Sequence, residues 1–260
     1  MLEVLTNELE EMRGKLIEVI MEIQDIELQQ NPRIEMEWQT KVGCWVLKAQ
    51  EADLAARRAK RKLALLQAAI NVGKEADESL VELALDKEFE AWSMQVAATQ
   101  NAYERALERR KARTALSAQD AAELKRLHRI LVKRLHPDVA GELRGFAQRA
   151  FELMQAAYEA GDVEMLRSLE VSTQDLERAD DVITNVDELN AEIALCEAQL
   201  TVEQEHLENL KNDKPYSLKD KLNNPDWLSE TITPLKEQIK ECTKIKEAYD
   251  QRIEAIRRGA

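Results

Sequence analysis

The chain has 260 residues, of which 33% are charged and only 4% aromatic, with seven glycines and five prolines. So many charges and so few turn-forming residues are typical of long helices and not of a compact globular enzyme, so we predict an all-α fold. The net charge of −13 argues against general nucleic-acid binding, and no apolar run reaches the roughly 18 residues that a membrane-spanning helix needs.

Site chemistry is sparse. Cys44, Cys196 and Cys242 are far apart and form no Cys-x-x-Cys pair, so neither a disulfide framework nor a zinc site is expected. A phosphate-binding Walker loop, a Gly-x-Ser-x-Gly motif and a nucleophile–base pair with supporting spacing are all absent from the sequence. We therefore expect no enzyme activity, no metal and no cofactor, and a reducing cytoplasm as the location.

The N-terminal region, residues 1–113, has the periodicity of coiled coils. Apolar residues recur three and four apart from Leu2 to Ile26, and a second seam runs from Trp38 to Ile70. Between them, Asn31-Pro32 has the form of a helix cap followed by proline at the first helical position. This junction predicts an antiparallel hairpin over residues 1–61.

A third apolar seam runs from Val81 to Ala106. The tripeptide Asn71-Val72-Gly73 precedes this seam and leaves two alternatives for the helix. The helix breaks there, or residues 33–113 form a single helix about 120 Å long at roughly 1.5 Å per residue.

Residues 124–138 read LKRLHRILVKRLHPD. Leucines at helical spacing form an apolar stripe, namely Leu124, Leu127, Leu131 and Leu135. Proline lacks an amide hydrogen and disfavours helical backbone in the residue before it, so Pro137 predicts a helix end near Leu135. His136 and Asp138 then begin a loop beside a cationic helix face, which suits docking better than catalysis.

A second amphipathic stretch begins near Glu142 and ends at Gly161. Its apolar positions are Phe146, Ala150, Phe151, Met154, Ala157 and Tyr158. We expect the two helices to close against each other as an antiparallel hairpin.

Residues 114–170 resemble the J-domain of the DnaJ co-chaperone family. In that family a basic second helix ends in His-Pro-Asp, and a third helix carries Phe-x-x-Ile-x-x-Ala-Tyr, which reads here as Phe151, Met154, Ala157 and Tyr158. The family's arginine seven residues before the histidine is Arg129.

The resemblance implies docking on a DnaK-type chaperone, stimulation of its ATP hydrolysis, and capture of a client protein chosen by the rest of the chain. The chaperone-binding residues it implies are His136, Pro137, Asp138, Lys125, Arg126, Arg129, Lys133 and Arg134. Without a Cys-rich zinc module or a Gly/Phe-rich linker, the chain is similar to the J-domain-only class.

Two departures from the family pattern stand out. The family's Tyr-Tyr-x-Leu-Leu-Gly segment is missing from the region before Leu116, and His128 occupies a usual tyrosine position. We expect Tyr103, Ala106 and Leu107 to back the hairpin instead.

Three positions after residue 113 have the form of helix starts. They are Asp162, Ser172 and Ser117, which lies three residues before Asp120.

The C-terminal region, residues 171–260, is predicted to be a second coiled-coil hairpin. An apolar seam from Val182 to Leu210 and another from Leu235 to Ile256 flank a proline-containing turn. We expect these two helices to pack antiparallel, and residues 75–113 to lie against 174–211.

Two other functions compete with the co-chaperone. One is a structural or adaptor coiled-coil protein with a non-functional J-like module. The other is nucleic-acid binding through residues 57–62 and 105–134, although the basic run at 57–62 lacks interleaved aromatics and is better interpreted as a solvated helix face. The seams can be satisfied by self-association into a homo-oligomer or by helices folding back within one chain.

Overall fold

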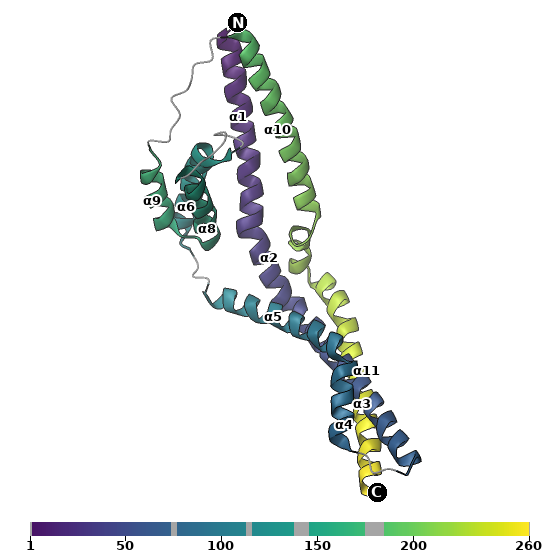
Figure 1. Ribbon diagram of the computed structural model, residues 1–260. Helices are drawn as coiled ribbons and strands as arrows, with labels where there is room; N and C mark the ends of the chain where they lie inside the picture. Colours follow the sequence, from purple (N-terminus) through teal and green to yellow (C-terminus); the bar gives the residue numbers. More distant parts are fainter. Residues whose placement is uncertain (1, 74–76, 113–115, 138–145, 175–184, 260) are drawn as a thin grey trace. The chain divides into compact units, whose positions relative to one another are not determined.

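A computed structural model describes residues 2–73, 77–112, 116–137, 146–174 and 185–259 (Figure 1). The described residues form helices joined by turns and contain no strand, so the predicted all-α fold is confirmed. The chain divides into two compact units. The first comprises Met1–Ile34 and Thr114–Leu218, and the second Glu35–Arg113 and Lys219–Ala260.

The helix that begins at Leu2 continues without a turn to Asn71. Its parts are α1 (Leu2–Asp25), the π-helical η1 (Ile26–Gln30), α2 (Asn31–Trp38), the π-helical η2 (Gln39–Gly43) and α3 (Cys44–Asn71). The predicted hairpin over residues 1–61 is therefore wrong. Asn31 is helical, with φ −58° and ψ −47°, and its N–H donates to the Ile26 carbonyl. A proline ring crowds the carbonyl four residues earlier, and the wider π turn before Pro32 relieves that crowding.

The chain breaks after Asn71, which settles the alternative that the sequence left open. Gly73 has φ +70°, a left-handed conformation that glycine adopts without strain. The next helices are α4 (Glu78–Glu88) and α5 (Glu90–Ala112). They return antiparallel along α3. Lys62, late in α3, pairs with Glu78 at the start of α4, and Arg57, earlier in α3, lies over the ring of Trp92 in α5.

In the second unit, α11 (Pro225–Gly259) also packs along α3, and the two helices run in the same direction. Lys236 lies over the Trp45 ring near the start of both helices, and Ile253 is buried with Leu63 and Leu66 near their ends. The helix α11 begins at Pro225, ten residues before the predicted apolar seam starts at Leu235, and it contains Pro234.

The first unit repeats this parallel arrangement with α10 (Val186–Asn212), which follows α1 (Figure 1). Leu9 is buried with Leu189 in one cluster, and Ile23 with Leu207 in another. The predicted C-terminal hairpin is wrong, because α10 packs on α1 and α11 packs on α3. The predicted pairing of residues 75–113 with 174–211 fails for the same reason. Short 3-10 turns, η4 (Tyr216–Leu218) and η5 (Lys221–Asn223), follow α10.

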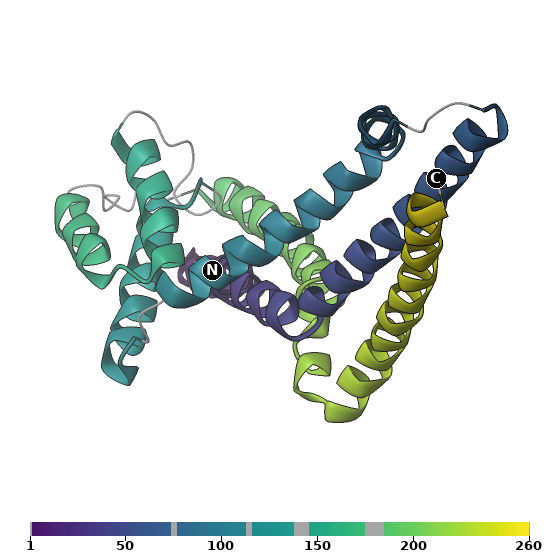
Figure 2. The same ribbon diagram turned by 90° about the horizontal axis from the view of Figure 1, so that it is seen from below.

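Three shorter helices form a cluster in the first unit: α6 (Ala118–Leu135), α8 (Phe146–Ala160) and α9 (Val163–Ser172) (Figure 2). Of these, α6 packs directly on α1. Their shared core contains the leucine stripe of α6 and the apolar face of α8. The remaining buried residues come from α1 (Leu16, Ile17, Ile20) and α9 (Val163, Leu166, Leu169). The expectation that Tyr103, Ala106 and Leu107 back the hairpin is wrong, since α1 and α9 supply that backing.

The helix ends follow local sequence signals, with one exception. The Ser117 hydroxyl accepts from the Asp120 N–H and caps α6, and Gly161 ends α8 with φ +72°. Asp162 caps α9 as predicted. Ser172 was predicted to start a helix but is the last residue of α9, so that prediction is wrong. The start predicted for α8, near Glu142, lies outside the described residues.

Because Leu16 is 1% exposed in this core, we expect Leu16→Ala to lower the opening free energy of α6 and α8 by about 2–5 kcal/mol. Hydrogen exchange of α6 and α8 amides in the full chain measures this energy. Leu195→Ala is the control, because Leu195 on α10 is 53% exposed. Equal effects from the two variants would contradict the role assigned to α1.

Candidate functional site

The C-terminal end of α6 is set by proline, as predicted. The helix ends at Leu135, and His136 turns to extended backbone with φ −72° and ψ 129° while its N–H donates to the Val132 carbonyl at 2.9 Å. The His136 ring is half-buried, edge-on to the Phe151 ring with 5.3 Å between centroids. Pro137 is exposed, and Asp138 lies outside the described residues. His136 and Pro137 are thus presented directly after the end of α6.

Three basic residues of α6 face outward in a row. Lys125, Arg129 and Lys133 are four residues apart, and residues at that spacing are neighbours on a helix surface. All three are exposed, and the row leads toward Pro137, four residues further on. We call these three residues the basic row.

The basic row borders acidic residues of α1. Lys125 Nζ lies 3.7 Å from Asp25 Oδ1, and Arg129 Nη2 lies 3.4 Å from Glu18 Oε1. The side chains of Lys125 and Arg129 remain 65% and 60% exposed. Exposed ion pairs contribute about 0–1 kcal/mol each, so these contacts leave both cations accessible to a partner.

The other two described arginines of the predicted docking face attach α6 to α9. Arg134 Nη1 donates to the Glu170 carbonyl at 2.8 Å and to the buried Thr173 hydroxyl at 2.9 Å. Arg126 pairs with the carboxylates of Glu123 and Glu170. Arg134 therefore has a structural task that the sequence pattern did not reveal.

A buried polar network joins α1, α6 and α8, and sequence reasoning missed it. His128 is fully buried, with Nε2 2.7 Å from Gln24 Oε1 and its ring stacked on Tyr158 at 3.7 Å between centroids. The Tyr158 hydroxyl donates to Asp25 Oδ1 at 2.8 Å, and the Gln29 amide donates to the Tyr158 carbonyl. His128 lies next to the leucine stripe in the sequence, and this position is a visible signal of its burial. No sequence pattern points to its partner Gln24, which is 104 residues away.

Burial determines the charge states in this network. It lowers the pKa of His128 to about 4, although the negative charge of Asp25 acts in the opposite direction. Burial also raises the pKa of the Tyr158 hydroxyl, and Asp25 adds to that shift. Both side chains are neutral at pH 7, which suits packing between helices. Within the described ranges, no cluster of three His, Cys, Asp or Glu side chains could hold a metal ion.

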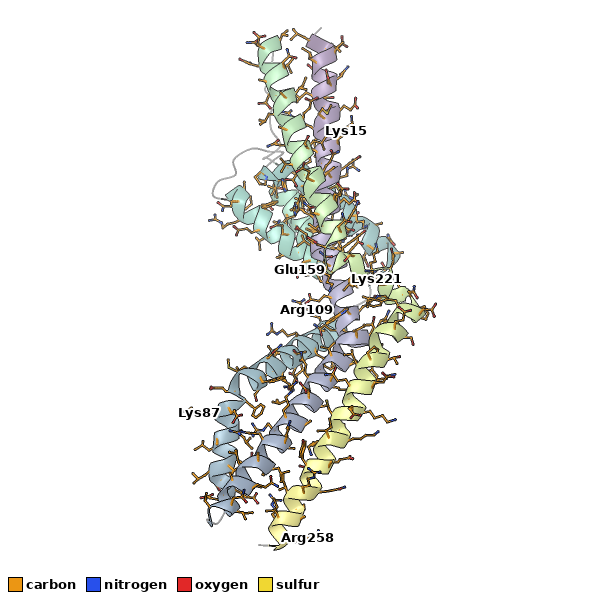
Figure 3. The ribbon with its side chains drawn as sticks, turned by 90° about the vertical axis from the view of Figure 1, so that its right-hand side faces the viewer. Lys15, Lys87, Arg109, Glu159, Lys221 and Arg258 are labelled. Carbon is orange, nitrogen blue, oxygen red and sulfur yellow. The ribbon has the colours of Figure 1, made fainter. Side chains whose placement is uncertain are left out.

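Within the basic run at residues 57–62, Arg58, Arg61 and Lys62 pair with acidic residues of α4. Arg58 contacts Glu82 and Asp86 at 3.1 and 2.7 Å, and Lys62 donates to Glu82 at 2.5 Å, which lowers the pKa of that carboxyl. Lys87 lies on the outer side of α4, away from α3 (Figure 3). The sequence predicts a solvated face for this run. Much of its charge is paired within the second unit, which weakens the case for nucleic-acid binding there.

No family model, curated protein or solved structure matches this chain. Among the helices in the described parts of the chain, none is both long and apolar enough to cross a membrane. The geometry of α6 and its neighbours is therefore the main guide to function.

Adjacent cations of α6 should respond differently to truncation. We expect Arg134→Ala to destabilise the packing of α6 on α9 by about 1–3 kcal/mol, because it removes charge-assisted hydrogen bonds to partly buried acceptors. Lys133→Ala should change stability by less than about 0.5 kcal/mol, because Lys133 is exposed. Hydrogen exchange of α9 amides would compare the two variants, and equal losses would contradict the structural role of Arg134.

Proposed function

We propose that this protein is a J-domain co-chaperone, which docks on a DnaK-type chaperone and stimulates its ATP hydrolysis. The coiled-coil helices then select a client protein or an assembly. In this proposal the protein works in the cytoplasm, is not itself an enzyme and uses no cofactor.

The observation that carries the proposal is the basic row and the way it leads into His136-Pro137 at the end of α6. An exposed row of cations attracts an acidic surface and orients the encounter. The antiparallel packing of α8 supports it further, since the residues of the Phe-x-x-Ile-x-x-Ala-Tyr pattern lie in or against the hairpin core: Phe151, Met154, Ala157 and Tyr158.

The contacts of α6 suggest a division of labour among the eight predicted docking residues. The basic row would contact the acidic chaperone surface, and the His136 ring, held by Phe151, would be presented with Pro137 and Asp138. Arg126 and Arg134 would act as positioning residues that hold α6 on α9.

We expect His136→Gln to abolish stimulation of a DnaK-type chaperone's ATPase without unfolding the protein, because His136 follows the end of α6 and is only half-buried. Single-turnover ATP hydrolysis measures the effect, and circular dichroism checks folding. His206→Gln is the matched control, because the His206 side chain is 47% exposed on α10. A large loss of helicity in His136→Gln would show instead that the residue is structural.

The basic row should make docking sensitive to salt. We expect Arg129→Ala to weaken chaperone binding about 2- to 5-fold at low ionic strength and less at high salt, because screening reduces exposed charge interactions. Arg167→Ala on α9 is the control, since Arg167 is a comparably exposed arginine, 47% exposed, outside the row. Titration calorimetry at two salt concentrations would test this. Binding that is unaffected by salt would count against electrostatic docking.

The second candidate is an adaptor coiled-coil protein whose J-like module does not couple to a chaperone. The backing of the hairpin by α1 and the use of Arg134 for internal hydrogen bonds favour it. In that case the coiled-coil helices would carry the partners, including a second copy of the chain. Absence of ATPase stimulation by a folded wild-type protein would select this candidate.

A further inference from the structure

The contact between α1 and the α6–α8 hairpin contains a titratable ring with no route to solvent. His128 is fully buried where the three helices meet, with α1 on one side through Gln24 and α8 on the other through Tyr158. The Gln24 oxygen accepts from Nε2–H, so Nδ1 is the nitrogen that takes up a proton. Among the described residues, Nδ1 has no hydrogen-bond partner.

Protonation at Nδ1 would therefore place a charged donor in a dry interior without an acceptor, which is costly. The groups around it give limited compensation. On α1, Asp25 attracts the charge but already accepts from the Tyr158 hydroxyl of α8. Just after the end of α6, His136 lies close enough for its charge to oppose protonation of His128. Once the hairpin leaves α1, water can hydrate the imidazolium.

We propose that His128 is a proton-operated latch: in its neutral form it holds the α6–α8 hairpin against α1, and its protonation releases the hairpin. The latch concerns the contact between α1 and the hairpin and does not depend on any chaperone. Its release would also separate Asp25 and Glu18 from the two basic-row residues that they adjoin, Lys125 and Arg129.

The direction of the pH effect follows from the two protonation equilibria. The held state has a His128 pKa of about 4, against the ordinary value of 6.5 for an exposed histidine. Between these values only the released state binds the proton, so the latch is strongest above about pH 6.5 and weakens as the pH falls. These values give a shift toward release of about 30-fold between pH 7.5 and pH 5.

Hydrogen exchange of the full chain at pH 7.5 and pH 5, corrected for intrinsic exchange rates, tests the latch. We expect protection of α6 and α8 to fall about 30-fold relative to α11, whose helix contains no histidine. His128→Phe keeps an aromatic ring for stacking on Tyr158 and should remove this pH dependence, whereas His206→Gln should retain it. Unchanged protection in the wild type, or an equal loss in His128→Phe, would overturn the proposal.

A second measurement does not require a substitution at His128. The chain has three histidines, so NMR of the ring protons can follow each one, with His136→Gln and His206→Gln as assignment variants. We expect His128 to titrate well below pH 6.5 in the wild type, because the held state resists its protonation, and to move toward about 6.5 in Leu16→Ala, where the contact with α1 is weakened. Titration of His128 near 6.5 in the wild-type protein would show that no latch exists. Neither measurement involves a chaperone, so failure here leaves the proposed function untouched.

Discussion

The apolar contact between α1 and the cluster of α6, α8 and α9 is the interaction on which the candidate site depends. Helices of 10 to 18 residues are marginal by themselves in water and are stabilised mainly by burying an apolar face. Leu16, Ile17 and Ile20 of α1 supply part of the surface that these faces need, and α9 supplies more. Because α1 also packs against α10 along another face, a single long helix is shared between a coiled-coil pair and the α6–α8 hairpin.

This packing determines which side chains of α6 point into the core and which face outward. The leucine stripe is buried, His128 turns with it toward Gln24 and Tyr158, and Arg134 turns toward α9. Lys125, Arg129 and Lys133 of the basic row are among the residues left facing outward, and the row leads into the His136-Pro137 helix end. The proposed docking face is therefore the side of α6 that does not pack against its neighbouring helices. Any change that rotates α6 against α1 or α9 would alter it, which connects the buried network to the proposed docking.

The sequence predicted local features well and long-range pairings poorly, for a physical reason. Helix ends such as Pro137, Gly161 and the Ser117 cap depend on backbone chemistry within a few residues, and all are observed. Heptad seams show that a helix has a partner but do not say which one, so α10 and α11 were paired with each other and not with α1 and α3. The cap-like Asn31-Pro32 was a local signal that the π-helical turn overrode. Gln24 carried no signal, since it lies beside the apolar seam and resembles the other polar residues of the helix.

The most direct test of the central claim, that the outward face of α6 docks on a chaperone, is a hydrogen-exchange footprint of the full chain with an ATP-bound DnaK-type chaperone. The expected result is added protection in α6 and at the start of the following loop, with little change in α10 and α11. Protection confined to α10 or α11, or absent everywhere at saturating chaperone, would contradict the claim and favour an adaptor in which the coiled-coil helices bind the partners.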